Sequence, residues 1–188
     1  IYDNFARGSE ENLAGALKDP RVSIYDIGGD IMQTDILQSA FDGADGVFHF
    51  AALWLLQCHD YPRTAFDVNV RGTFNVMEAC VAKGVKRLVS SSSASVYGDA
   101  VREPMDEDHP YNNKNFYGAT KIAGEAFLRS FHHRYGLDYV GLRYMNVYGP
   151  RQDPNNPYSG VISIFIDRLL DNKNITINGG DQTRDFIY

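Results

Sequence analysis

Apolar, strand-like runs alternate with amphipathic stretches of helical length along most of this chain. Such alternation is typical of α/β proteins, because a helix joins each strand of a parallel sheet to the next. We therefore expect an α/β fold with a doubly wound parallel sheet. The expected strands are 22–27, 46–52, 86–91, 138–146 and 174–178. The expected helices are 35–41, 63–83, 117–135 and 159–171, of which the second and third end at Gly84 and Gly136.

Length and charge narrow the class of protein. The 188 residues, 44% apolar and 22% charged, are enough for one domain with a substantial core. A net charge of −6 argues against nucleic acid as the main partner, because phosphate binding needs a basic face. No apolar run reaches the length of a membrane span and no signal-peptide pattern is present, so we expect no membrane partner and a cytoplasmic location.

Cysteine and histidine do not form the pattern of a metal site. Cys58 and Cys80 have no ligand spacing, and each is more often a small buried apolar residue than a ligand or half of a disulfide. The five histidines also lack ligand spacing. We therefore expect no bound metal.

Tyr117 and Lys121 are four residues apart in the expected helix 117–135. Residues at this spacing lie on one face of a helix, so the phenol and the ammonium can point into the same cleft. A free tyrosine titrates near about 10, and a nearby cation favours the phenolate that could act as a base. Ser93, at the end of a neighbouring strand, could hydrogen-bond the substrate oxygen whose proton moves. The three residues suit reversible oxidation of an alcohol, whereas the Tyr-Lys pair alone is more often an exposed helix face.

Further segments follow in order along the chain. The serine run 90–93 leads into 94–98 (Ala-Ser-Val-Tyr-Gly), and 142–150 (Leu-Arg-Tyr-Met-Asn-Val-Tyr-Gly-Pro) and 183–186 (Thr-Arg-Asp-Phe) come later. With these segments the chain resembles the extended short-chain dehydrogenase/reductase family, in its nucleotide-sugar epimerase/dehydratase branch. The resemblance runs from Asp3 to the last residue. It implies a Rossmann-type fold, NAD as cofactor, a nucleotide-sugar substrate and a homodimer.

Both ends of the chain differ from the pattern that this resemblance implies. Residues 1–4 read as the end of a buried strand, and 185–188 stop within an apolar run. We therefore expect an internal fragment that lacks the family's first strand, its glycine-rich turn and most of the C-terminal substrate region. The glycines at 28–29 lack the spacing of that turn. We expect a partial NAD-binding domain at 1–153 and the start of a substrate-binding region at 154–188, with 154–157 as the most linker-like segment.

The resemblance assigns cofactor contacts to short segments at strand ends. Asp3 would accept hydrogen bonds from the adenosine ribose and repel a 2′-phosphate, which favours NAD over NADP. A simple Asp-Asn turn is the structural alternative, and Arg7 is a cation that could accommodate a phosphate. Asp30 and Ile31 resemble the pair that lies against adenine. The expected cofactor-binding residues are Asp3, Asn4, Asp30, Ile31, Phe50, Ala51, Ala52, Asn69, Ser91, Tyr117, Lys121 and Tyr144.

Trp54 departs from the pattern of some 4-epimerases, which carry a lysine at this position, two residues after Ala52. One phosphate contact is therefore in doubt. The apolar string 53–56 is more often packing or a subunit contact than a platform for a sugar.

The residues after Ser93 indicate which reaction to expect. Dehydratases of the branch carry an Asp-Glu pair there, and this chain has Ala94 and Ser95, so the acid and base that dehydration needs are missing. The resemblance then favours epimerisation at C4 of a nucleotide sugar through a 4-keto intermediate, and a UDP-sugar is the expected substrate. Expected catalytic residues are Ser93, Tyr117 and Lys121, and expected substrate-binding residues are Ser93, Tyr117, Asn146 and Arg184.

Two alternatives stay open. A reductase, decarboxylase or dehydratase of the same family would keep the same three catalytic residues. A non-catalytic dinucleotide-binding protein on the same fold would have no need of a phenolate base. The sequence identifies neither the nucleotide nor the sugar.

Overall fold

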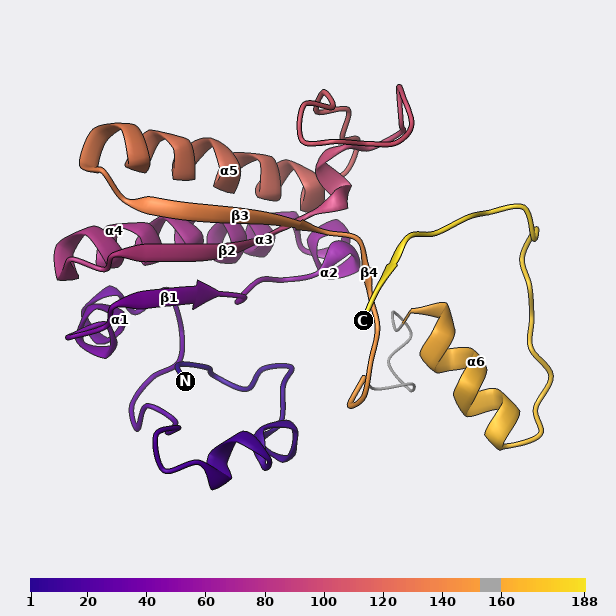
Figure 1. Cartoon of the computed structure of the whole chain (residues 1–188), viewed down its shortest axis with the longest axis horizontal. Coiled ribbons are helices and arrows are strands. Elements are labelled where there is room, and N and C mark those ends of the chain that lie inside the picture. Colours follow the sequence, from indigo (N-terminus) through magenta and orange to yellow (C-terminus); the bar gives the residue numbers. More distant parts are fainter. Residues whose placement is uncertain (153–159) are drawn as a thin grey trace. The chain divides into compact units, whose positions relative to one another are not determined.

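The computed structural model describes residues 1–152 and 160–188 (Figure 1). The chain divides into two units, Ile1–Arg143 and Tyr144–Tyr188, each of which is described by itself. The domain boundary expected at 153/154 lies outside the described residues and stays a prediction.

A three-stranded sheet lies at the centre of the first unit, in the order β1 (Gly46–His49), β2 (Arg87–Ser93), β3 (Asp138–Tyr144). β1 and β2 are parallel, with Gly46 opposite Arg87 and His49 opposite Ser90. Figure 1 shows all three arrows running in the same direction. The carboxyl ends of the strands therefore meet at one edge of the sheet, which is where ligands bind in folds of this type.

Helices precede and connect the strands of this sheet. They are α1 (Thr34–Ala40), α2 (Leu55–Asp60), α3 (Pro62–Ala65), α4 (Thr73–Lys83) and α5 (Phe116–Tyr135). Three single-turn 3-10 helices lie at Glu10–Leu13, Ala16–Lys18 and Ala94–Val96. The helices expected at 35–41 and 117–135 are thus confirmed to within one residue at each end. α4 and α5 end at Gly84 and Gly136, as predicted.

The helix expected at 63–83 contains a feature that the sequence pattern did not predict. Residues Phe66–Gly72 form a π-helical segment between α3 and α4. Such segments are rare and frequently occur at functional sites. This one carries Asn69, whose side chain is described with the site below.

The core forms where α1, α4 and α5 pack around the sheet. α4 buries Val76, Met77 and Cys80, and α5 buries Leu128 and Phe131, in each case on one helical face. The buried apolar cluster consists of Ile31, Leu37, Phe41, Val76, Met77, Ala79, Cys80, Val85, Leu88, Leu128, Phe131 and Leu137.

Two expected strands are absent, so those predictions were wrong. Residues 22–27 lack regular strand structure, because among the described residues only Ile1 pairs with them in the manner of a strand: its amine donates to the Ser23 carbonyl (2.6 Å) and its carbonyl accepts from the Tyr25 amide (2.7 Å). A strand needs a partner along several residues. Residues 174–178 are also irregular, and in the described part of the chain no strand pairs with them. The strand expected at 46–52 stops at His49, opposite Ser90.

The second unit contains β4 (Asn146–Val147), α6 (Val161–Leu170) and β5 (Phe186–Ile187). β4 and β5 are parallel, with Asn146 opposite Phe186. The strand expected at 138–146 is therefore split into β3 and β4, and the helix expected at 159–171 is confirmed from Val161. Among the described residues, no helix is both long and apolar enough to span a membrane.

We expect the burial of α4 to be measurable with two matched substitutions. Val76 is 2% exposed, whereas Val101 is 61% exposed. Val76→Ala should lower the free energy of unfolding by about 2 kcal/mol, because two methyl groups leave the core. Val101→Ala should change it by less than about 0.5 kcal/mol. Urea denaturation of the full-length protein measures both, and equal losses would contradict the placement of α4.

Candidate active site

The end of β2 and the first turns of α5 are held together by close backbone packing. Asn115 caps α5, because its side-chain oxygen accepts a hydrogen bond from the Gly118 amide (2.8 Å). A side chain at position 118 would overlap the Asn113 amide oxygen and the Ser95 carbonyl oxygen. Glycine therefore lets α5 approach the 3-10 turn Ala94–Val96 that follows β2.

This packing brings the three predicted catalytic residues together. The Ser93 hydroxyl accepts a hydrogen bond from the Ser95 amide (3.1 Å) and lies close enough to the Tyr117 phenol to lower its pKa. The Lys121 ammonium donates to the Ser91 carbonyl (2.8 Å) and lies 5.6 Å from the centre of the Tyr117 ring. Tyr117 and Lys121 are both largely buried. The expected shared face of the helix is thus present.

Burial shifts the pKa of both titrating groups towards their neutral forms. It lowers the pKa of Lys121 to about 8. It also raises the pKa of Tyr117, although the hydrogen bond from Ser93 and the charge of Arg7 act in the opposite direction. The direction for Tyr117 is opposite to the effect expected of a neighbouring cation. In this structure the phenol is therefore protonated at neutral pH, and further positive charge is needed to form the phenolate.

Asn69, an expected cofactor-binding residue, ties the segment after β1 to α5. Its amide oxygen accepts from the Leu53 amide (2.6 Å), and its amide nitrogen donates to the Leu53 carbonyl (2.9 Å) and the Thr120 hydroxyl (3.2 Å). The residue is 3% exposed. Its side chain thus supports the walls of the site from within, and the π-helical segment provides its position.

The residues expected at the adenosine end of the cofactor also converge. The Tyr2 hydroxyl donates to the Asp30 carbonyl (2.9 Å), and a side chain at Gly29, whose φ is +104°, would overlap the Asp3 carbonyl. Asp3 accepts from the Phe5 amide (2.7 Å) through one carboxylate oxygen, which is the turn that was the structural alternative. Asp30 accepts from the Met32 amide (2.9 Å) in the same way. Each carboxylate has a second oxygen that can accept from a ligand.

The other residues expected to bind the cofactor lie beside these carboxylates in the sequence or at the end of β1. Ile31 is buried, and its carbonyl accepts from the Asn75 amide group (3.0 Å). The Asn4 side chain accepts from the Ala6 amide (3.1 Å). Phe50 is 59% exposed and Ala51 is exposed, at the carboxyl end of β1. These small or exposed side chains leave the backbone accessible to a ligand.

Arg7 and Trp54, the two residues that complicated the cofactor prediction, contact each other. The guanidinium carbon of Arg7 lies 3.3 Å from the centre of the Trp54 ring. Burial lowers the pKa of Arg7, and its charge acts on Tyr117. Arg7 therefore places a cation against the Trp54 ring and close enough to act on Tyr117.

These residues fit NAD. A dinucleotide needs acceptors for its ribose hydroxyls and adenine amine, which Asp3 and Asp30 would provide, and donors beside the nicotinamide ribose, which Lys121 and Tyr117 would provide. Gly29 supplies the close backbone approach at the adenosine end. In the described part of the chain, no three histidine, cysteine, aspartate or glutamate residues are placed to hold a metal ion.

Three further predicted site residues belong to the second unit. The Asn146 side chain donates to the Asp185 carbonyl (3.0 Å). The exposed Arg184 donates to the carbonyl of its neighbour Thr183 (2.7 Å). Tyr144 begins this unit and is partly exposed. The roles predicted for these residues stay predictions.

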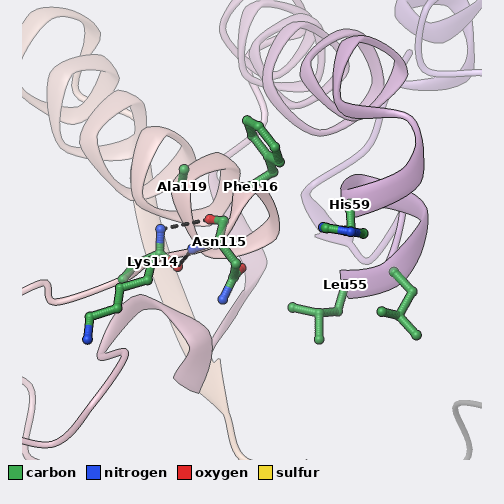
Figure 2. A pocket seen from close by; sticks show the side chains of 8 residues that line it. Leu55, His59, Lys114, Asn115, Phe116 and Ala119 are labelled. Carbon is green, nitrogen blue, oxygen red and sulfur yellow. Dashed lines mark hydrogen bonds between the residues drawn. The ribbon is translucent and has the colours of Figure 1, made fainter.

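A cavity of about 710 Å³ lies between α2 and the first turns of α5 (Figure 2). The apolar string 53–56 contributes part of its wall, and Leu55 is 45% exposed. Tyr117, on a neighbouring face of α5, is not among the lining residues. These are Leu55, Leu56, His59, Asn113, Lys114, Asn115, Phe116 and Ala119.

Glu125 and Arg143 were not predicted, although they contact the site. Glu125 accepts hydrogen bonds from Ser92 (2.5 Å) and from Arg143 (2.8 Å). One signal was available, because Glu125 follows Lys121 by four residues and so lies on the same helical face. Arg143 had no comparable signal outside the resemblance.

Comparison with known proteins agrees with this geometry. Residues 4–188 match the sequence model of the NAD dependent epimerase/dehydratase family. A protein named putative UDP-glucose 4-epimerase, from Methanocaldococcus jannaschii, is 38% identical over an alignment of 192 positions that covers 100% of this chain and 60% of that protein. Proteins named dTDP-glucose 4,6-dehydratases are also among the relatives. The chain thus spans about three fifths of the relative's length.

Solved structures of the same kind superimpose on the chain. The UDP-N-acetylglucosamine 4-epimerase of Methanobrevibacter ruminantium, in complex with UDP-N-acetylmuramic acid, has a TM-score of 0.92 and 38% identity, over 99% of this chain and 59% of that one. The Thermus thermophilus UDP-glucose 4-epimerase, in complex with NAD, has a TM-score of 0.84 and 34% identity, over 99% and 61%. The predicted Rossmann-type fold and the predicted cofactor, NAD, are confirmed.

We expect Asp3 to select NAD over NADP, because its carboxylate would lie beside the ribose hydroxyl that carries the 2′-phosphate. Full-length protein should bind NADP at least about tenfold more weakly than NAD, and Asp3→Ala should narrow this ratio. Asp108→Ala, which removes an exposed carboxylate from another loop, should leave the ratio unchanged. Calorimetric titration measures all three proteins. Equal affinities in the wild type would contradict the role of Asp3.

Proposed function

The chain belongs to the NAD dependent epimerase/dehydratase family, and from that premise we propose that the protein epimerises a nucleotide sugar, most simply a UDP-sugar, at C4. The observation that carries this proposal is the convergence of Ser93, Tyr117 and Lys121 at the carboxyl end of β2. The similarity to proteins named UDP-glucose 4-epimerase supports it.

Tyr117 is the proposed proton acceptor. Oxidation of a C4 hydroxyl requires a base at the oxygen, and the phenolate of a buried tyrosine can take that proton and later return it. Ser93 already lies beside the phenol and lowers its pKa. Its hydroxyl can therefore hydrogen-bond the sugar oxygen and Tyr117 together, which orients the proton transfer.

Lys121 provides positive charge on the same face of α5. Its ammonium uses one donor on the Ser91 carbonyl (2.8 Å), which fixes its position and leaves two donors for a ribose. NAD, when bound, supplies the hydride acceptor and, in its oxidised form, a positively charged ring. The site can then favour the phenolate that burial alone disfavours.

We propose that Asn146 and Arg184 bind the substrate, together with Ser93 and Tyr117, and that Tyr144 borders the cofactor. A nucleotide sugar presents a diphosphate, and the planar fork of an arginine matches phosphate oxygens well. The Arg184 guanidinium is exposed, so it can reach a ligand. A homodimer and a cytoplasmic location remain part of the proposal as the sequence predicted them, as does the division into a cofactor domain at 1–153 and a substrate region at 154–188.

Epimerisation is preferred over dehydration because of the residues that follow Ser93. Dehydration adds an acid for the leaving hydroxyl and a base for the C5 proton. Ala94 and Ser95 supply neither, and both lie in the 3-10 turn that packs against Gly118. Because relatives named dehydratases exist, the two reactions need to be separated, and a deuterium label at C4 of the substrate does so.

Tyr117→Phe should retain NAD and nucleotide sugar but lose turnover by about 10²–10⁴-fold, because only the proton acceptor is removed. Tyr135→Phe, which changes an exposed tyrosine at the other end of α5, is the matched control and should behave as wild type. Epimerase assays at saturating substrate measure both variants. Near wild-type turnover in Tyr117→Phe would exclude the proposed base.

Substrate deuterated at C4 should give a C4 epimer that keeps its label, with no net cofactor reduction and no loss of water. The reason is that an epimerase returns the hydride to the carbon from which it came. Mass spectrometry of the products of full-length enzyme shows the outcome. A product lighter by one water would indicate a dehydratase, and stoichiometric consumption of added reduced cofactor would indicate a reductase.

A further inference from the structure

A partly buried ion pair lies next to the candidate active site. Glu125 and Arg143 have side chains that are 12% and 16% exposed, and they form a two-pronged contact through the Arg143 Nη2 (2.8 Å) and Nε (3.0 Å). Every other ion pair among the described residues includes a side chain that is more than a third exposed. Pairs that are shielded in this way have a geometry that the fold determines.

Glu125 links this pair to the strand that carries the proposed catalytic serine. Its Oε1 accepts a hydrogen bond from the Ser92 hydroxyl (2.5 Å), and its Oε2 accepts from the Tyr111 hydroxyl (2.7 Å). Burial alone would raise the pKa of Glu125, but the hydrogen bonds from Arg143, Ser92 and Tyr111 outweigh burial and lower it. Glu125 is therefore ionised, and both of its oxygens are bonded.

Three consecutive residues of β2 thus contact α5 through different groups. The Ser91 carbonyl accepts from Lys121, the Ser92 hydroxyl donates to Glu125, and the Ser93 hydroxyl lies beside the Tyr117 phenol, whose pKa it lowers. The α5 partners are 117, 121 and 125, which follow one another at four-residue intervals on one helical face. A shift of α5 along β2 would break all three contacts together.

Arg143 extends the same network to the connection before α5. It donates to the Glu107 carbonyl (2.9 Å) and to the Tyr111 hydroxyl (3.2 Å), and its guanidinium lies 5.0 Å from the centre of the Tyr97 ring. β3 is therefore joined to the segment that leads into the first turn of α5.

We infer that Glu125, clamped between Ser92 and Arg143, is a positioning residue that sets the register of α5 on β2 and so holds Tyr117 and Lys121 against Ser93 and Ser91. It touches no reacting atom in this account. The inference rests on the proposed chemistry of Tyr117 and Lys121, which gives the register its importance.

Glu125→Gln in the full-length protein is the test, because it keeps the shape of the side chain and removes its charge. We expect kcat for C4 epimerisation to fall by about 10–100-fold while KM changes by less than about threefold, since misplaced catalytic groups affect the transition state more than substrate binding. Glu78→Gln, on the exposed face of α4, makes the same chemical change away from the site and should match wild type.

The pKa of Lys121 gives a second measurement that needs no substrate. We expect it to rise in Glu125→Gln from about 8 toward 10.5, the ordinary value, because water reaches an ammonium that is no longer held at Ser91. Loss of a negative charge would by itself move this pKa downward, so a rise reports position and not charge. NMR titration of lysine labelled at Cε measures it in cofactor-free protein, with Lys121→Arg to assign the signal.

The outcomes separate the possibilities. A Glu125→Gln variant with unchanged kcat, or one with reduced kcat and an unchanged Lys121 pKa, would overturn the positioning role. If Glu125→Gln does not fold, Ser92→Ala carries the same two measurements, and wild-type values in both would likewise overturn it. Wild-type protein without C4 turnover would refute the proposed epimerase function, while the Lys121 titration would still decide the role of Glu125.

Discussion

The contact between Lys121 and the Ser91 carbonyl is the interaction on which the site depends. It joins the second turn of α5 to the last residues of β2 at 2.8 Å, and it places an ammonium in a largely buried position. Burial alone disfavours this charge and lowers its pKa to about 8. The free-energy cost of burying this charge is offset only if the backbone around Lys121 holds its hydrogen-bond acceptor in place. The close approach at Gly118, the amide of Asn69 and the Asn115 cap all serve to fix that backbone.

The two titrating groups of the site are shifted in directions that a cofactor can reverse. Burial raises the pKa of the Tyr117 phenol and lowers that of the Lys121 ammonium, so it favours the neutral form of each group. The addition of a cationic ring and a dianionic diphosphate would change this electrostatic environment. The chain's own residues thus provide orientation, and the reactivity of Tyr117 depends on what binds beside it.

Much of the site could be predicted from the sequence because it follows from helical spacing and strand ends. Tyr117 and Lys121 share a face at four residues' separation, and Ser93 ends a strand, so their meeting needed little tertiary information. The apolar pattern of residues 22–27 could not show whether they form a strand, because a strand also needs a partner of sufficient length. Among the described residues only Ile1 pairs with this segment. The π-helical turn at Phe66–Gly72 keeps the apolar pattern of an ordinary helix and left no signal. Helical spacing places Glu125 on the same face of α5 as Lys121, but the sequence does not indicate its ion pair, because Arg143 is distant in sequence.

The central claim is that Tyr117 becomes a phenolate when the site holds oxidised NAD, although burial in the protein alone opposes this. Ultraviolet difference titration of full-length protein, with and without NAD, measures tyrosine ionisation directly, and subtraction of Tyr117→Phe isolates the residue. The account predicts that the Tyr117 pKa lies above about 10 without NAD and falls below that value with NAD bound. A Tyr117 pKa that stays above 10 in the NAD-bound protein would contradict it.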